Sequence, residues 1–196
     1  SLYAQATSGS SEASRILIQF PIDQIVSDRT AGIVPTENVS YYLKLFNIEH
    51  SETLPKNYDI DILAVSSSWE EGNGVDTFNY TDLTHDGIGS NWINAKSGSK
   101  WTSVGGDYHA SPVFSANFKK GNEDIEVDVT TLVVQWISGS KQNYGFGLKL
   151  SASYEAYSPV SSSSQIKNLD GAKFSYYTKQ FYARSTGDFH NQPTLE

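Results

Sequence analysis

The chain contains no cysteine, which excludes a disulfide framework, a thiolate metal site, an iron–sulfur cluster and a cysteine nucleophile. It also lacks methionine, and from the missing initiator residue we expect either a processed chain or a piece of a longer protein. Basic residues are few, because 14 Lys and Arg stand against 22 Asp and Glu for a formal net charge of −8. Binding to nucleic acid needs clustered Lys and Arg, so this balance argues against such a partner. The longest apolar runs hold about six residues, whereas a membrane-spanning helix needs about 20, so we expect no membrane partner.

Aromatic residues, by contrast, are abundant, with 4 Trp, 12 Tyr and 9 Phe beside 15 Gly. This composition, with many small hydroxyl residues and few Lys and Glu, is typical of strands and turns rather than helices. The 196 residues are enough for one domain that buries a full core without covalent staples. We therefore expect a single domain across residues 1–196.

Alternation of apolar and polar residues predicts a series of short strands. These strands are expected at residues 15–20, 39–48, 58–65, 113–118, 123–129, 144–150, 174–177 and 180–183. The first 14 residues are expected to form a lead-in strand and loop, and residues 156–171 a Ser-rich loop. The strands at 39–48 and 58–65 are expected to form a hairpin-like unit.

One segment, residues 130–138, has the spacing of a helix instead. Its apolar side chains recur at Leu132, Val133, Trp136 and Ile137, which places them on one helical face. Asp128 or Thr130 can cap its start and Gly139 can end it.

Many short strands with one short helix predict an all-β protein, and specifically a jelly-roll-like antiparallel β-sandwich. Residues 66–112 show little periodicity and hold three of the four Trp. A stretch of this length is unusual in a compact domain unless it packs as a defined loop. We therefore expect an ordered, long Trp-rich loop.

Several short motifs occur in a characteristic order. They are Arg15-Ile-Leu-Ile-Gln-Phe20, Trp69-Glu-Glu-Gly72, Asn91-Trp-Ile-Asn94, Gly98-Ser-Lys-Trp-Thr102, Gly105-Gly-Asp-Tyr108, Asp128-Val-Thr130, Trp136-Ile-Ser-Gly139 and Asn143-Tyr-Gly-Phe146. With these motifs the chain resembles the DNRLRE domain family, β-sandwich modules related to a group of carbohydrate-binding modules. The first strand region is shorter than in that family, and Asn91 stands where the family has Thr.

The C-terminal part resembles a version of this family found in virion proteins of tailed phages. The residues that carry this second resemblance are Lys173-Phe-Ser-Tyr-Tyr177, Phe181-Tyr-Ala-Arg-Ser-Thr186 and Pro193-Thr-Leu-Glu196. The resemblance implies a non-catalytic virion structural module, such as a head decoration, a neck or tail protein or a fibre component. Its partners would be other virion proteins and copies of itself, and its location would be the virion or the extracellular medium. The alternative is a carbohydrate-binding module of a secreted or surface protein, which would bind a glycan such as one on a host surface.

Four aromatic residues are candidates for stacking on sugar rings: Trp69, Trp92, Trp101 and Tyr108. Aromatic faces suit the apolar faces of pyranose rings. The alternative is that the tryptophans close one end of the sandwich and fix the long loop, since a buried Trp usually finds a partner for its N–H group.

Calcium is the one cofactor that the loop composition suggests. Asp82 and Asp86, flanked by Asn79, Gly87 and Asn91, offer oxygen ligands of the kind that Ca²⁺ takes. Loop Asp and Asn also satisfy turns through local hydrogen bonds, and the EF-hand pattern is absent. We therefore expect no cofactor, with calcium at Asp82 and Asp86 as the alternative.

No motif indicates an enzyme. The four His lack the spacing of a zinc site, and His109 near Asp107 is close only in sequence, which is poor evidence for a catalytic triad. Glu70 and Glu71 are adjacent on the chain, so on a strand they point opposite ways and cannot face one glycosidic bond. Glu70 is expected to cap or pair with the loop, and Gly105-Gly106 to form a turn of positive φ.

Overall fold

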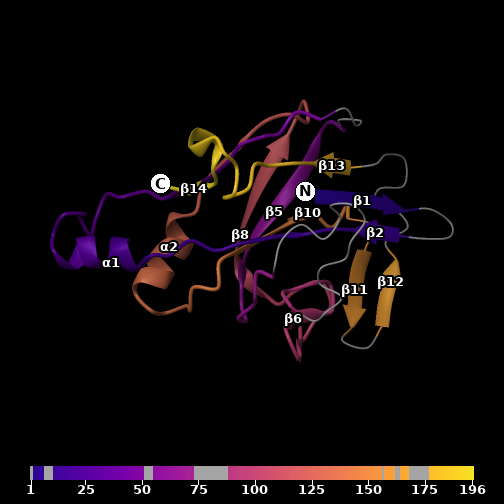
Figure 1. Cartoon of the computed structure of the whole chain (residues 1–196), viewed down its shortest axis with the longest axis horizontal. Coiled ribbons are helices and arrows are strands. Elements are labelled where there is room, and N and C mark those ends of the chain that lie inside the picture. The colour runs from indigo at the N-terminus through magenta and orange to yellow at the C-terminus, as the bar shows by residue number, and fades with distance from the viewer. Residues whose placement is uncertain are drawn as a thin grey trace.

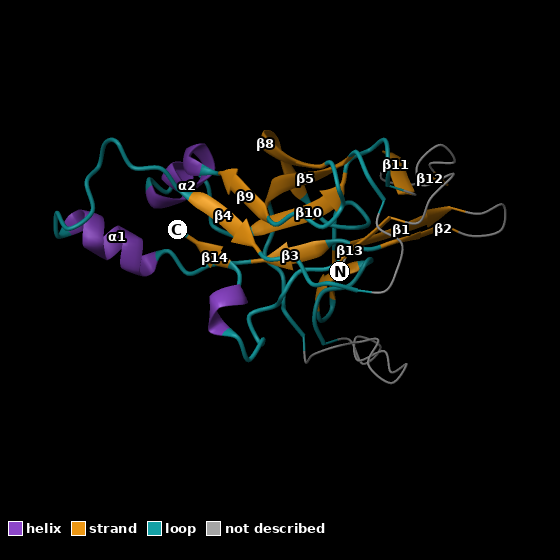
Figure 2. Cartoon of the chain, turned by 90° about the horizontal axis from the view of Figure 1, so that it is seen from above, coloured by secondary structure: helices purple, strands orange, loops and turns teal. Residues whose placement is uncertain are grey.

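The computed structural model describes residues 2–6, 11–50, 55–72, 88–155, 157–161, 164–167 and 177–196. Most of the regular structure in these ranges is antiparallel strand, joined by two α-helices (Figures 1 and 2). The prediction of an all-β protein is therefore confirmed. One short helix is expected from the sequence, and the described residues contain two α-helices.

The larger sheet is built from four antiparallel strands. In spatial order they are β3 (Ile16–Ile18), β10 (Phe146–Leu150), β5 (Tyr58–Val65) and β8 (Tyr108–Phe118). The strict alternation of β5 explains its place in the middle, because Ile60 and Ile62 are fully buried while Asp59 and Asp61 between them are half-buried. β8 begins five residues before the predicted start at Val113.

A second sheet has the order β14 (Thr194–Leu195), β4 (Tyr42–Leu45) and β9 (Ile125–Asp128). β4 and β5 therefore lie in different sheets, and the predicted hairpin-like unit of residues 39–48 and 58–65 is wrong. β4 pairs instead with β9, with Leu43 opposite Val127. Alternation tells which face of a strand is buried, but it does not identify the neighbouring strand.

Three further sheets complete the strand structure of the described residues. They are β13 (Tyr177–Lys179), β1 (Leu2–Ala6) and β2 (Ser11–Ala13) in one sheet, β11 (Tyr157–Ser161) with β12 (Ser164–Lys167), and β6 (Asn94–Lys96) with β7 (Ser99–Lys100). β11 and β12 form a hairpin within residues 156–171, so the expectation of a loop there is wrong. β1 pairs with β13, so a strand from the first residues lies beside one from the last 20 residues (Figure 1).

The helix predicted at residues 130–138 is confirmed as α2 (Thr130–Ile137), which buries Leu132, Val133 and Trp136. The N-cap residue is Val129 rather than Asp128 or Thr130, although the Asp128 carboxylate accepts the Thr130 N–H at 2.9 Å. The unpredicted helix is α1 (Asp23–Thr30), none of whose residues is buried. Ile25 and Val26 pack against the core but are only partly buried, and α1 has no continuous apolar stripe, which is the signal that identifies a helix in a sequence. A 3₁₀ turn, η2 (Phe189–Asn191), precedes β14.

One hydrophobic core takes side chains from both larger sheets and from α2. Its fully buried members include Leu43 of β4, Ile60 of β5, Leu132 of α2 and Leu148 of β10. Aromatic pairs extend it, and the rings of Tyr58 and Phe118 stack with centroids 5.0 Å apart. In the part of the chain that the structure describes, no helix is long and apolar enough to cross a bilayer.

Candidate functional site

The four aromatic residues predicted to stack on sugars lie in or next to a small cluster that contains Val65, the last residue of β5, and Ala95 of β6. Trp101 is buried with Val65 and Ala95 in a small second cluster, against which Trp69 and Tyr108 pack. Trp92 adjoins this cluster through a shared neighbour, because the Arg15 guanidinium lies 4.8 Å from the Trp92 ring centroid and 5.8 Å from that of Tyr108. The structure thus brings together side chains that span 40 positions of sequence.

Two of these tryptophans are fixed by hydrogen bonds to the backbone. The Trp69 indole N–H donates to the Tyr144 carbonyl, and that of Trp101 donates to the Asn91 carbonyl, both at 2.8 Å. These bonds agree with the alternative role of the tryptophans, in which they fix the long loop rather than stack on sugars. Trp69 and Trp92 are half-buried, whereas Trp101 is only 6% exposed. Sugar stacking at these residues stays a prediction.

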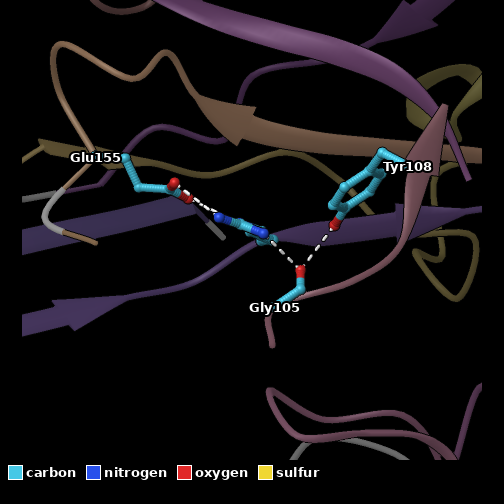
Figure 3. A network of polar contacts seen from close by, with 4 residues as sticks. Gly105, Tyr108 and Glu155 are labelled. Carbon is cyan, nitrogen blue, oxygen red and sulfur yellow. Dashed lines mark hydrogen bonds and ion pairs between the residues drawn. The ribbon is translucent and has the colours of Figure 1, made fainter. Parts of the chain in front are cut away.

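Arg15 and Glu155 form a buried ion pair beside the aromatic cluster (Figure 3). Arg15 Nε and Nη2 donate to the two Glu155 carboxylate oxygens, each at 2.8 Å, while Nη1 donates to the Gly105 carbonyl at 2.7 Å. The Tyr108 hydroxyl donates to the same carbonyl at 2.9 Å. The two charged side chains are 7% and 3% exposed, so this network is nearly closed to water.

Burial and the ion pair together set the protonation states of Arg15 and Tyr108. Burial by itself would lower the pKa of Arg15, but the hydrogen bonds and the charge of Glu155 outweigh it and raise that pKa. Burial also raises the pKa of Tyr108, which keeps its hydroxyl protonated as a donor. In the sequence, Arg15 is recognisable only as part of a strand motif. A single basic residue at the start of an apolar strand was the only sequence signal for this buried role.

The glycines at positions 105 and 106 form the predicted turn, with φ of +88° and +115°. A Cβ atom at Gly105 would lie 2.7 Å from Arg15 Nη1, so the turn approaches the guanidinium too closely for any side chain. The two glycines therefore allow the Gly105 carbonyl to reach the Arg15 guanidinium.

Acidic residues of the loop are used as acceptors for its backbone. The Asp107 carboxylate accepts the N–H groups of Thr102 at 2.9 Å and Ser103 at 2.7 Å, and Ser67 Oγ lies 3.2 Å away. Glu70 accepts the Ser97 N–H at 3.2 Å, which confirms the expectation that it caps the loop.

A pocket of about 840 Å³ is lined by β3, which is an edge strand of the larger sheet in the part of the chain that the structure describes. Residues 16–23 and residues 181–184 form two of its walls, and Trp69, Glu71 and Arg184 contribute side chains. Trp69 therefore borders both the aromatic cluster and the pocket. Sequence reasoning missed the pocket because its walls come from segments more than 150 positions apart.

The candidate calcium ligands Asp82 and Asp86 lie outside the described residues. Among the residues that are described, His, Asp and Glu form no group of three or more that could hold a metal ion.

No protein-family model, curated protein or solved structure matches this chain. The resemblance to the DNRLRE family therefore rests on the motifs themselves.

Proposed function

We propose that this chain is a non-catalytic structural module of a tailed-bacteriophage particle, with a jelly-roll-like β-sandwich fold. It would act through contacts with other virion proteins and with copies of itself. The observation that carries this proposal is the use of the motif residues. Arg15, Trp69, Trp101 and Asp107 belong to the motifs that resemble the DNRLRE family, and each makes internal hydrogen bonds that hold the loop.

The edge of β3 that has no paired strand among the described residues supports a role in protein contacts. An edge strand offers unpaired backbone N–H and C=O groups to which an extended segment of another chain can add. The pocket beside β3 gives such a segment room next to apolar and charged side chains. The net charge of −8 adds long-range repulsion that keeps free copies soluble before assembly.

The proposal is tested on phage particles from the source organism, banded twice on a density gradient and analysed by quantitative mass spectrometry. We expect the chain to band with the major capsid and tail proteins at a constant ratio across the particle peak. Host proteins trapped during lysis should lose that constant ratio on the second gradient. A chain that stays at the top of the gradient would show the proposal to be wrong.

Carbohydrate binding is the second candidate, and one observation favours it. Trp69 borders the pocket together with charged Glu71 and Arg184 and the amide side chain of Gln142. An aromatic face beside a few convergent polar groups is the usual composition of a small-molecule site. A virion module can also bind a host glycan, so the two functions are compatible.

A glycan array followed by calorimetry tests this second candidate. We expect Glu71→Ala to weaken binding of any sugar at the pocket at least tenfold. Glu126→Ala is the matched control, because Glu126 is also an exposed acidic residue and does not border the pocket. An array without hits, or equal affinity of the two variants, would rule out a sugar site in the pocket.

A further inference from the structure

Lys179 of β13 is a buried lysine, only 1% exposed. Its ammonium group lies over two adjacent aromatic rings, 4.7 Å from the Phe118 centroid and 5.1 Å from the Phe181 centroid. Nζ donates to Asn47 Oδ1 at 2.7 Å, and also to the carbonyls of Gly121 at 3.2 Å and Glu123 at 2.6 Å. Lysine is among the residue types that are almost never fully buried.

The environment of Lys179 increases the share of its neutral, nucleophilic form. Burial lowers its pKa to about 8, against the opposing charges of Glu123 and Asp124. At pH 7 about one molecule in ten then carries a neutral amine, far more than for a lysine in water. Lowering the pKa by desolvation is a general way in which proteins activate a lysine as a nucleophile.

Asn47 is held in front of this amine by contacts on both sides. It forms a β-bridge with Phe181, and its backbone N–H donates to Asp124 Oδ1 at 2.7 Å. Since a C=O bond is about 1.2 Å long, Nζ lies no farther than about 3.9 Å from the Asn47 amide carbon. Reacting atoms in a near-attack arrangement are about 3–3.5 Å apart with their orbitals aligned. Nζ would therefore have to move closer by up to about 0.9 Å and turn its lone pair from the direction of Oδ1 toward Cγ.

We propose that Lys179 and Asn47 join in an intramolecular isopeptide bond. The Nζ lone pair attacks Cγ of Asn47, the Cγ–Nδ2 bond breaks, and a proton from Nζ goes to Nδ2, which leaves as ammonia. One amine and one primary amide thus give one secondary amide and ammonia, with no oxidant, reductant or cofactor. Asp124 acts as a positioning residue, because it holds the Asn47 backbone.

The bond would join two segments that are 132 positions apart. It would tie the strand next to the C-terminal part of the chain to the segment that follows β4. A cross-link of this kind stabilises mainly by restricting the unfolded chain, and the restriction grows with the length of the loop that it closes. The chain lacks cysteine, so a disulfide cannot supply the same constraint.

Intact mass spectrometry of the folded, purified chain tests the proposal after prolonged incubation at mildly alkaline pH. We expect a mass lower than that of the sequence by one ammonia, and a branched peptide that joins Asn47 to Lys179 after proteolysis. The variants Lys179→Arg and Asn47→Ala should each keep the full mass. Lys120→Arg, at an exposed lysine nearby, should lose ammonia as the parent does. Asp124→Asn should form the bond more slowly, and Asp124→Glu should recover part of the rate.

Two results would overturn the proposal. One is a parent chain that folds, as judged by circular dichroism, and retains its full mass. The other is loss of ammonia without a branched peptide, which would indicate succinimide formation at an asparagine. Because both readouts use the folded parent chain, a variant that fails to fold does not affect the conclusion.

Discussion

Replacing Glu155 by Gln should destabilise the protein by about 3 kcal/mol, because it removes the only counter-charge bonded to the buried Arg15 side chain among the described contacts. The two side chains are 7% and 3% exposed, so water cannot solvate the guanidinium that remains. Breaking a buried ion pair from one side costs about 3–5 kcal/mol. Gln keeps the shape of Glu and one oxygen acceptor, which places the expected loss at the lower end of this range.

The measurement is urea unfolding followed by tryptophan fluorescence, with a check that the slope with denaturant does not change. The matched control is Glu71→Gln, because Glu71 pairs with Arg184 through two similar bonds of 3.1 and 2.9 Å. That pair is 65% and 79% exposed, and an exposed pair contributes about 0–1 kcal/mol. If Glu155→Gln costs no more than Glu71→Gln, burial does not set the strength of this pair. A double replacement by Met at Arg15 and Leu at Glu155 should recover most of the loss, since it leaves no unpaired charge.

Three further changes test other parts of the structure. Gly145→Ala should lower the free energy of unfolding by more than about 2 kcal/mol, because the new Cβ would lie 2.2 Å from the Ile18 carbonyl oxygen at a φ of +82°. Gly139→Ala, also at positive φ but in open space, should lower it by about 1 kcal/mol. Equal losses measured by urea unfolding would contradict this reasoning. Hydrogen bonds from Thr130 lower the pKa of Asp128, so this carboxylate stabilises the fold above its unfolded pKa and loses that effect as pH falls through the lowered value. The melting temperature of Asp128→Asn should therefore fall less than that of the parent between about pH 5 and pH 2. Asp107→Ala should speed thermolysin cleavage just before β8, and unchanged cleavage would show that the carboxylate does not order this loop.

The elements that could be predicted from the sequence are those in which the spacing of apolar residues matches the buried face. Residues 58–65 alternate strictly and form β5 with the same bounds, and the apolar stripe of residues 130–138 forms α2. α1 has no buried residue and so leaves no pattern to read. The partner of β4 could not be predicted, because strand pairing depends on contacts between distant segments.

The candidate site was predictable to the same extent. The aromatic residues selected from the sequence do meet in one region, since large aromatic side chains in a loop need a common place to pack. The charged residues that hold this region were not predictable as partners. Arg15 and Glu155 are 140 positions apart, and a buried charge looks like a surface charge in a sequence.

The two buried cations tie distant segments of a cysteine-free chain together, but their chemistry differs. The Arg15 guanidinium stays charged at every accessible pH and meets a carboxylate through two parallel bonds, so its link to Glu155 is an ion pair and cannot become covalent. Lys179 donates instead to the side-chain amide of Asn47 and to two backbone carbonyls. Carbonyl acceptors stabilise the charged ammonium form less than a carboxylate does. Deprotonation of Lys179 to the neutral amine therefore costs less free energy here than it would beside a carboxylate. Burial therefore leaves Arg15 in a permanent ion pair, whereas it gives Lys179 the neutral amine that the proposed isopeptide bond requires.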